Sequence, residues 1–302
     1  MRVTVVGGSG FIGSKLVAAL RQRGDEVTVT GRSAVTLAKR FGEGVGRVEW
    51  DPVQGPPPAE ALEGCDGVIN LAGESVASGR WTKARRERIR ASRVEGTRHL
   101  VAALAAASDK PKVLVNASAI GYYGDAAHRA LHETSANASD FLAEVCAAWE
   151  GEASKARAAG VRTAIARFGV VLGREGGAYP LMSRPFRLFV GGPIGLGRRW
   201  ISWIHLDDVV GLLLHLLDTP TADGVFNGTA PQPVSNAEFT KELAAALKRP
   251  ALFPVPPLAL KLLLGGFAAV VLSSQRVLPM RTLASGYAFR YPTLRGALEG
   301  LR

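Results

Sequence analysis

The N-terminal run VTVVGGSGFIGSKLVAAL (3–20) constrains the fold of this chain more than any other stretch. A β-branched segment leads into Gly7, Gly10 and Gly13, spaced GxxGxxG, and an amphipathic segment follows, so the run predicts a strand, a tight turn and a helix. In such a turn the first glycine allows the bend, the second lets the backbone approach a pyrophosphate, and the third lets the helix pack closely. The N–H groups at the helix start favour an anion. We therefore predict a dinucleotide-binding turn; a glycine-rich turn without a ligand is the alternative.

The end of the second predicted strand, TVTGRS (28–33), indicates which dinucleotide is bound. A cofactor without a 2′-phosphate is usually held here by an acidic side chain that bonds the ribose hydroxyls. This chain has Arg32 instead, and a guanidinium pairs with phosphate through two parallel hydrogen bonds. The sequence therefore favours NADP(H) as cofactor, with a solvated surface arginine as the alternative.

The first half of the chain alternates between strand-like and helix-like segments. Nearly continuous apolar runs are typical of strands buried on both faces of a parallel sheet, and alternation with helices predicts a doubly wound, Rossmann-type α/β fold. The expected strands are 2–7, 26–31, 46–50, 67–73, 112–118 and 161–169, and the expected helices are 11–23, 34–41, 83–107 and 139–159.

The alternation stops at about residue 175, where Gly and Pro cluster. We therefore expect an NADP-binding domain at 1–172, to which part of 199–230 returns, and a smaller mixed substrate lobe at 173–302. In the second half, 206–218 is predicted as a helix and 224–229 as a strand. The apolar stretch 258–272 is interrupted by Lys261 and a glycine pair, so it is too short to span a bilayer. We expect a buried or interface helix, with membrane association as the minor alternative.

Composition narrows the class of protein without choosing a function. The net charge is +11, which suits phosphates, nucleic acids and acidic lipids alike. Cys65 and Cys146 lie far apart and predict neither a disulfide framework nor a metal site. The N-terminus lacks a signal-peptide pattern, so we expect a cytoplasmic protein. We expect no membrane partner, because no segment looks able to span a bilayer. Nucleic-acid binding through the basic helix at 80–98 is a weaker alternative; no interleaved aromatics or RNA-module motif supports it, so we expect no nucleic acid.

Several motifs resemble those of the extended short-chain dehydrogenase/reductases. They are NLAG (70–73), SRVEGTRHL (92–100), ASAIGYYGD (117–125) and WIHLDDVV (203–210). A closer resemblance, over essentially the whole chain, is to an atypical branch, the YfcH-like NAD(P)-binding "epimerase family" proteins. It rests on NLAGESVASGRW (70–81), FLAEVCAAWE (141–150), RFGVVLGREGGAYPLM (167–182) and the tail VLPMRTLASGYAFRYPTLRGAL (277–298), which resembles that branch's small C-terminal domain, about 250–302 here.

The resemblance also implies a catalytic Tyr-x-x-x-Lys pair that this chain lacks. In the superfamily the lysine lowers the tyrosine's pKa, and the tyrosine moves the substrate's proton. Aligned on Glu150, the lysine position is Cys146 and the tyrosine position is Leu142. Leucine has no proton to give, and a neutral thiol supplies no cation. A buried, inert role for Cys146 is the expectation.

Arg93 is the basic residue whose position suggests a role in the site. It shares a helix face with Ile89, Gly96 and Leu100, and this face should meet the sheet. A buried cation needs an anionic partner. One hypothesis is that Arg93 binds substrate or a cofactor phosphate. The other is a structural ion pair with Glu150 or Glu74.

In addition to Arg93, the remaining candidates for catalysis are Ser118, Tyr122 and Glu74. Ser118 lies near the superfamily's serine position, for which Ala119 competes. Tyr123 matches a structural tyrosine, and His205 is expected to be structural. Four arginines lie in or near the loop 191–200. They could bind an anionic substrate or could simply be solvated surface residues, and the two readings weigh equally: Arg184, Arg187, Arg198 and Arg199.

Two functions fit these residues. One is an NADP(H)-dependent oxidoreductase or nucleotide-sugar-epimerase-like enzyme with unusual acid/base groups, acting on an unidentified small molecule as a monomer or homodimer. The other is an NADP-binding sensor, scaffold or regulator without turnover. The expected cofactor contacts are Gly7, Gly10, Phe11, Ile12, Gly13, Arg32, Asp51, Leu71, Ala72, Gly73, Arg93, Ser118 and Arg167, and no metal ligands are expected.

Overall fold

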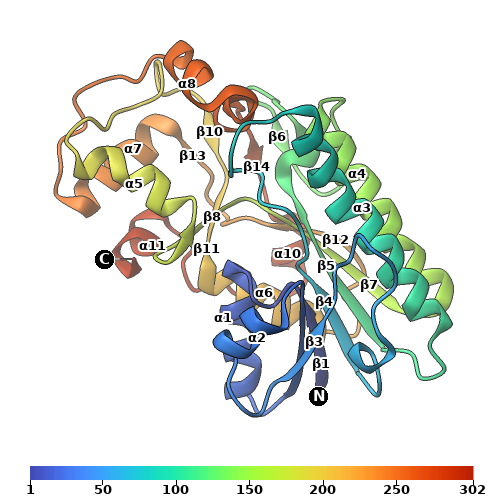
Figure 1. Ribbon diagram of the computed structural model, residues 1–302. Helices are drawn as coiled ribbons and strands as arrows, with labels where there is room; N and C mark the ends of the chain where they lie inside the picture. The colour runs from blue at the N-terminus through green and yellow to red at the C-terminus, as the bar shows by residue number, and fades with distance from the viewer. Residues whose placement is uncertain (302) are drawn as a thin grey trace.

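Seven parallel strands form the central sheet in a computed structural model that describes residues 1–301 (Figure 1). In sheet order they are β12 (Gly224–Gly228), β7 (Arg162–Phe168), β5 (Val113–Ala119), β4 (Gly67–Asn70), β1 (Arg2–Val6), β2 (Glu26–Gly31) and β3 (Gly46–Glu49). The predicted doubly wound α/β fold is confirmed. The chain reverses its direction of travel across the sheet between β1 and β4, the point at which such folds bind ligands.

Helices cover both faces of this sheet (Figure 1). The helices of this domain are α1 (Phe11–Gln22), α2 (Ala34–Arg40), α3 (Lys83–Ala106), α4 (Phe141–Ser154) and α6 (Leu206–Asp218). Helices α3 and α4 pack side by side on one face, and α1 and α6 on the other. The helix expected at 139–159 is shorter, because it begins after the cap Asp140 and tightens into a 3₁₀ turn at Lys155–Ala159. The main apolar core lies between the sheet and these helices.

The second lobe is mixed and has its own apolar core, built around Trp203, Tyr179, Phe186 and Phe239. Its helices are α5 (Tyr179–Arg187), α7 (Asn236–Leu247), α8 (Pro257–Leu264), α9 (Ala268–Leu272) and α11 (Leu294–Gly300). Helix α10 (Met280–Ala284) packs instead against β12, the edge strand of the central sheet. The remaining short strands are β6 (Ala130–Leu131), β8 (Val170–Gly173), β9 (Gly176–Gly177), β10 (Trp200–Ile201), β11 (Trp203–His205), β13 (Val234–Ser235) and β14 (Arg276–Val277).

The expectation of one helix over 258–272 is wrong. Gly265 takes a φ of +54° and ends α8, a 3₁₀ turn follows at Gly265–Phe267, and α9 begins afterwards. No residue of α8 is buried, so this segment is not a core helix. Across residues 1–301 no helix combines the length and apolar character that crossing a bilayer requires.

Asp208 fastens the C-terminal segment to the start of α6. The residue is fully buried, and its carboxylate accepts hydrogen bonds from the backbone N–H groups of Arg290 (2.7 Å) and Tyr291 (3.0 Å) and from the hydroxyl of Tyr287 (3.2 Å). Burial and the neighbouring carboxylate raise the pKa of Tyr287, so its hydroxyl stays protonated as a donor. These bonds join segments about eighty residues apart.

Replacing Asp208 by Ala should lower the free energy of unfolding by about 3 kcal/mol, because buried donors lose a charged acceptor. The matched control is Asp207→Ala. Asp207 is partly exposed and pairs with Lys15 (3.3 Å) and Arg290 (3.4 Å), so its loss should cost about 1 kcal/mol or less. Urea unfolding of both variants measures the difference. Equal losses would contradict the anchoring role of Asp208.

Candidate functional site

The glycine-rich turn after β1 has the geometry that a bound phosphate needs. Gly7 has a φ of +75°, which favours glycine, and its N–H donates to the carbonyl of Thr30 (3.1 Å). A Cβ on Gly13 would lie 2.6 Å from the Cα of Gly8, so α1 packs against the turn at a distance that admits no side chain. Gly10 offers no side-chain cap, and the first turn of α1 carries no acidic residue. The first N–H groups of α1 are thus free to bind an anion.

Phe11 connects this turn to the second lobe. Its ring lies against the β8–β9 hairpin, where a Cβ at Gly173, Gly176 or Gly177 would come within 2.8 Å of it. The hairpin glycines therefore make room for the ring, and the start of α1 is fixed between the two lobes. Ile12 instead packs against the main apolar core.

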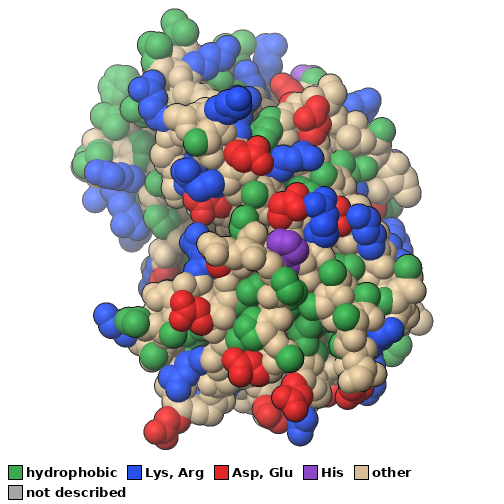
Figure 2. All heavy atoms as spheres, turned by 45° about the vertical axis from the view of Figure 1, so that its right-hand side comes forward, with side chains coloured by type: hydrophobic (Ala, Val, Ile, Leu, Met, Phe, Trp, Pro, Cys, Tyr) green, Lys and Arg blue, Asp and Glu red, His purple; other side chains and the backbone are tan. Residues whose placement is uncertain are grey.

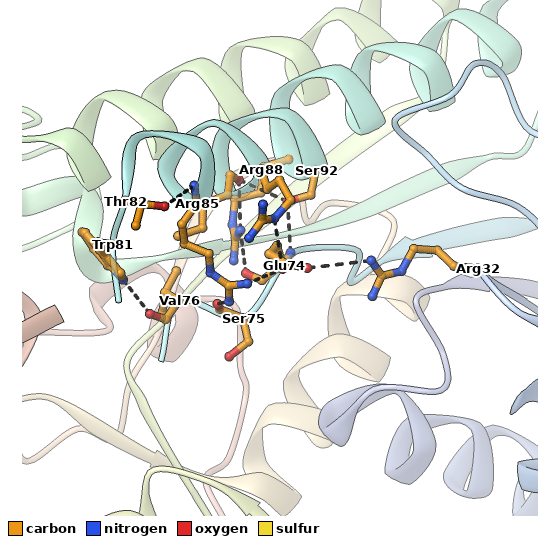
Figure 3. Close-up of polar contacts among 11 residues, drawn as sticks. Arg32, Glu74, Ser75, Val76, Trp81, Thr82, Arg85, Arg88 and Ser92 are labelled. Carbon is orange, nitrogen blue, oxygen red and sulfur yellow. Dashed lines mark hydrogen bonds and ion pairs between the residues drawn. The ribbon is translucent and has the colours of Figure 1, made fainter. Parts of the chain in front are cut away.

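Arginines from two segments converge on Glu74, just beyond β4 (Figure 3). The Glu74 carboxylate accepts a hydrogen bond from Arg85 Nη1 at 2.5 Å and lies 3.8 Å from Arg32 and 3.9 Å from Arg88. The Arg32 side chain is 70% exposed at the end of β2, whereas Arg85 is largely buried on α3. Glu74 was a candidate acid or base, but its oxygens face guanidinium groups. The carboxylate is thus surrounded by positive charge.

Arg93 lies on α3 beneath the end of β4. Its Nη1 donates to the backbone carbonyls of Glu74 (3.0 Å) and Ile89 (3.2 Å), and its Cζ lies 5.2 Å from the ring centroid of Trp149. A Cβ on Gly73 would lie 3.0 Å from the guanidinium. Burial lowers the pKa of Arg93, opposed by Cys146 and Glu74, yet an arginine keeps its charge in proteins.

Neither expected carboxylate pairs with Arg93. Within residues 1–301, Glu74 forms its ion pairs with Arg32, Arg85 and Arg88, and Glu150 forms its pair with Arg167. The Arg93 cation is thus held by carbonyl oxygens and an aromatic ring alone. It directs positive charge to the carboxyl end of β4, where a ligand of the sheet would lie.

Ser118 and Arg167 both turn toward Glu150 in the core. The Ser118 hydroxyl donates to Glu150 Oε1 (2.6 Å), and Arg167 donates to both carboxylate oxygens (2.7 and 2.6 Å). Arg167 is 3% exposed and also donates to the hydroxyl of Tyr123 (2.9 Å), which itself donates to Asn227 (2.8 Å). The network raises the pKa of Arg167 despite burial. These donors are used inside the fold.

Three further residues near Glu150 were considered for proton transfer: Cys146, Leu142 and Tyr122. Burial, reinforced by Glu150, raises the pKa of the Cys146 thiol to about 11, so it is protonated at neutral pH. Leu142 lies beside Gly121: a Cβ added to Gly121 would be 3.5 Å from the Cβ of Leu142. Tyr122 is partly exposed, and the Arg167 Cζ lies 3.4 Å from its ring centroid.

Asn70 is a positioning residue that sequence reasoning missed. Its amide donates to Asn116 (2.7 Å) and Thr97 (3.1 Å), and Thr97 also accepts from the indole of Trp149 (2.8 Å). Its oxygen accepts from the N–H of Ala72 (3.2 Å), which shapes the segment 71–73. An asparagine inside an apolar strand is the signal that could have found it, because buried amides need partners.

The structure thus brings the candidates to two neighbouring places, with Cys146 close to both. The first is the carboxyl edge of β1, β2 and β4, with the glycine turn, Arg32, the segment 71–73 and Arg93. Asp51, after β3, accepts the N–H of Val53 (3.2 Å). The second is the Glu150 network. His205 is buried and caps α6 by accepting the N–H of Asp207 (3.1 Å). Within residues 1–301, no side-chain hydrogen bond or ion pair links the loop arginines of the second lobe to either group.

Comparison with known proteins places the chain in a family. The model of the NAD dependent epimerase/dehydratase family matches residues 3–227, and a domain of unknown function, DUF1731, matches residues 255–301. The chain is 41% identical to the chloroplastic epimerase family protein SDR39U1 homolog of Arabidopsis thaliana, over all of this chain and 86% of that protein. It is 39% identical to the Homo sapiens protein SDR39U1, over 99% of both chains.

Solved structures agree with this placement. The crystal structure of human SDR39U1 (isoform 2) with NADPH matches with a TM-score of 0.88 at 37% identity, over 100% of this chain and 99% of that one. The UDP-glucose 4-epimerase of Thermus thermophilus, solved with NAD, matches with a TM-score of 0.77 at 21% identity, over 99% and 97% of the two chains, which shows likeness of fold. With a dinucleotide-type turn, a parallel sheet in the matching order and a family model covering residues 3–227, the chain belongs to the NAD dependent epimerase/dehydratase family, among the SDR39U1-like proteins.

Proposed function

We propose that this protein binds NADP(H) across the carboxyl edge of its sheet and reduces a carbonyl compound without a Tyr-x-x-x-Lys pair. The observation that carries the cofactor assignment is Arg32, an exposed guanidinium at the end of β2 where NAD-binding proteins hold ribose with a carboxylate. The relative crystallised with NADPH supports it. The uncapped first turn of α1 suits the pyrophosphate, and in this proposal the segment 71–73 after β4 lines the cofactor.

The arginines around Glu74 suit the 2′-phosphate. Arg32 is nearly 4 Å from the Glu74 carboxylate, a loose contact that a phosphate dianion can replace, because it offers more charge and more acceptors. Arg88 lies at a similar distance on the other side, 60% exposed. Glu74 meanwhile keeps Arg85 in place. In this proposal Glu74 orients the basic cluster and does not transfer protons.

Arg93 is assigned the role of stabilising negative charge on the substrate. The cofactor supplies or accepts a hydride, and reduction of a carbonyl leaves negative charge on its oxygen. A fixed cation near that oxygen stabilises it without reorganising. Arginine keeps its protons, so the proton that completes an alcohol comes from water or from Tyr122. Ser118 and Arg167, committed to Glu150, act as positioning residues.

A second function is favoured by the alignment on Glu150, in which Leu142 and Cys146 stand at the positions of the Tyr/Lys pair, and by burial, which raises the pKa of the Cys146 thiol to about 11. A protein that retains the cofactor turn without a Tyr/Lys pair to transfer the proton fits a sensor, scaffold or regulator in which NADP(H) stabilises one state. The two functions differ in whether hydride moves.

Arg32→Ala should weaken NADPH binding by about 10- to 100-fold, because one charge-assisted pair with the 2′-phosphate is lost, and it should leave NADH binding unchanged. Isothermal titration of both cofactors measures this. Arg40→Ala is the matched control, an exposed arginine at the end of α2, and should bind as the unaltered protein does. Equal weakening for NADH would remove Arg32 from the 2′-phosphate site.

Deuteride transfer tests the chemistry. With 4R- and 4S-deuterated NADPH and a panel of ketones and nucleotide sugars, the unaltered protein should transfer label. Arg93→Ala should still bind NADPH but transfer about 100-fold more slowly, and Arg93→Lys should fall between, because it keeps the charge without the planar fork. Arg90→Ala, an exposed arginine on the same helix, is the control.

Two results would redirect the assignment. Tight NADPH binding with no transfer to any acceptor would establish the second function for that panel. A loss of thermal stability in Arg93→Ala with unchanged cofactor binding and transfer would make Arg93 a structural residue only.

A further inference from the structure

A cluster of exposed apolar side chains lies at the end of the second lobe, on and beside α8. Leu196, Leu262 and Leu263 are 80%, 74% and 78% exposed, far more than a leucine in a protein core. We call this cluster the apolar tip. Its members are Leu188, Phe189, Val190, Leu196, Leu252, Phe253, Leu258, Leu262 and Leu263.

Contacts between the segments show that the apolar tip is one surface. Ile194 and Val255 form a β-bridge, with the N–H of Val255 donating to the carbonyl of Pro193 (2.8 Å). A Cβ on Gly192 would overlap the carbonyl of Phe253, so these two loops touch through their backbones. The Arg249 guanidinium lies 4.8 Å from the ring centroid of Phe189, which joins the end of α5 to the segment leading to α8.

The apolar composition of α8 indicates that this helix binds another surface. Its sequence, PLALKLLL, has one polar residue, Lys261, yet none of the eight is buried. A surface helix of a globular protein normally buries an apolar stripe and exposes a polar face. Contiguous exposed apolar residues of this kind mark a surface that binds a protein or a membrane.

The segments that form the apolar tip carry charge of one sign, while the neighbouring helix α7 exposes Glu238. Residues 176–206 contain no Asp or Glu, and neither do residues 243–298. Exposed basic side chains flank the apolar ones; they are Arg184, Arg187, Arg198, Lys248, Arg249 and Lys261. In Figure 2 hydrophobic and basic side chains lie next to one another on the upper left of the molecule, and acidic side chains gather elsewhere.

We propose that the apolar tip docks this protein onto the surface of a bilayer that contains anionic lipids. Leucine and phenylalanine side chains insert at the boundary of headgroups and acyl chains, and the surrounding Lys and Arg side chains meet the lipid phosphates. Such docking needs no spanning helix. It replaces our expectation of no membrane partner, which rested on the lack of a segment able to span.

Charge complementarity favours a bilayer over a second copy of the chain. In a two-fold dimer the same patch meets itself, so the basic side chains of one copy would face those of the other. Like charges brought together in this way oppose association. An anionic lipid surface instead attracts every one of these side chains, and it accommodates apolar residues that protrude from several loops.

The apolar tip also lies near the proposed cofactor edge. The turn after α8 reaches Trp81, whose ring centroid is 6.4 Å from that of Phe267, and a Cβ on Gly266 would lie 2.9 Å from Trp81. Trp81 follows Glu74 in the same loop, and its indole donates to the carbonyl of Val76 (2.8 Å). A docked tip would therefore hold this loop close to the lipid surface.

Vesicle co-sedimentation of the full chain tests the proposal. Vesicles of phosphatidylcholine with about 30% phosphatidylglycerol should bind the protein, and pure phosphatidylcholine should bind it at least tenfold less. Raising NaCl from about 0.1 M to 0.5 M should weaken the binding several-fold. The double variant Leu262→Glu/Leu263→Glu should bind the anionic vesicles at least tenfold less.

Val35→Glu is the matched control, because Val35 is 64% exposed on α2, outside the apolar tip. It should bind as the unaltered protein does, and Lys248→Glu/Arg249→Glu provides a second test that leaves the leucines intact. Thermal unfolding confirms that each variant folds. Absence of binding, or binding that neither double variant weakens, would overturn the proposal. So would a dimer in light scattering that Leu262→Glu/Leu263→Glu dissociates without any effect on vesicles.

Discussion

The buried ion pair between Arg167 and Glu150 is the interaction on which the arrangement of the site depends. It joins β7 to α4 through two hydrogen bonds, with Arg167 almost wholly shielded from solvent. A buried charge that loses its partner costs several kcal/mol, so each residue makes the other necessary. Through the same carboxylate the pair holds Ser118 on β5, and through the guanidinium it holds Tyr123.

This ion pair also determines which side chains of the site remain available for a reaction. A serine hydroxyl that donates to a buried carboxylate is already used, and the nearby thiol of Cys146 stays protonated because burial raises its pKa to about 11. Positive charge reaches the cofactor edge from α3 instead, where Arg93 is held by carbonyl oxygens. The fold thus separates a rigid, internally neutralised half of the site from a half with cationic side chains. Stabilisation of negative charge is the function that this division favours.

Sequence reasoning reached as far as local patterns extend. Continuous β-branched runs and a glycine turn predict the parallel sheet and the position of Arg32, because both follow from where strands end. The pairing of Glu150 with Arg167 could not be predicted. In the sequence, an arginine that will bind a buried carboxylate cannot be distinguished from one that will bind a phosphate. The contacts of Arg85 and Arg88 with Glu74 could not be predicted, because helical spacing does not show what a loop beyond β4 places opposite. The end of α8 at Gly265 depends on a positive φ angle, which the glycine pair in the sequence allows but does not require.

Two aromatic contacts join the lobes beside the proposed cofactor site. Phe11 extends from the dinucleotide turn into a hairpin of glycines, and Trp81 extends from the loop after β4 toward Phe267. Each belongs to a segment that borders the proposed cofactor and reaches into the second lobe. Movement of that lobe relative to the sheet would therefore disturb both the start of α1 and the loop that carries Glu74. A ligand that bridges the lobes and a surface that binds the apolar tip would then be coupled, because both act on these two contacts.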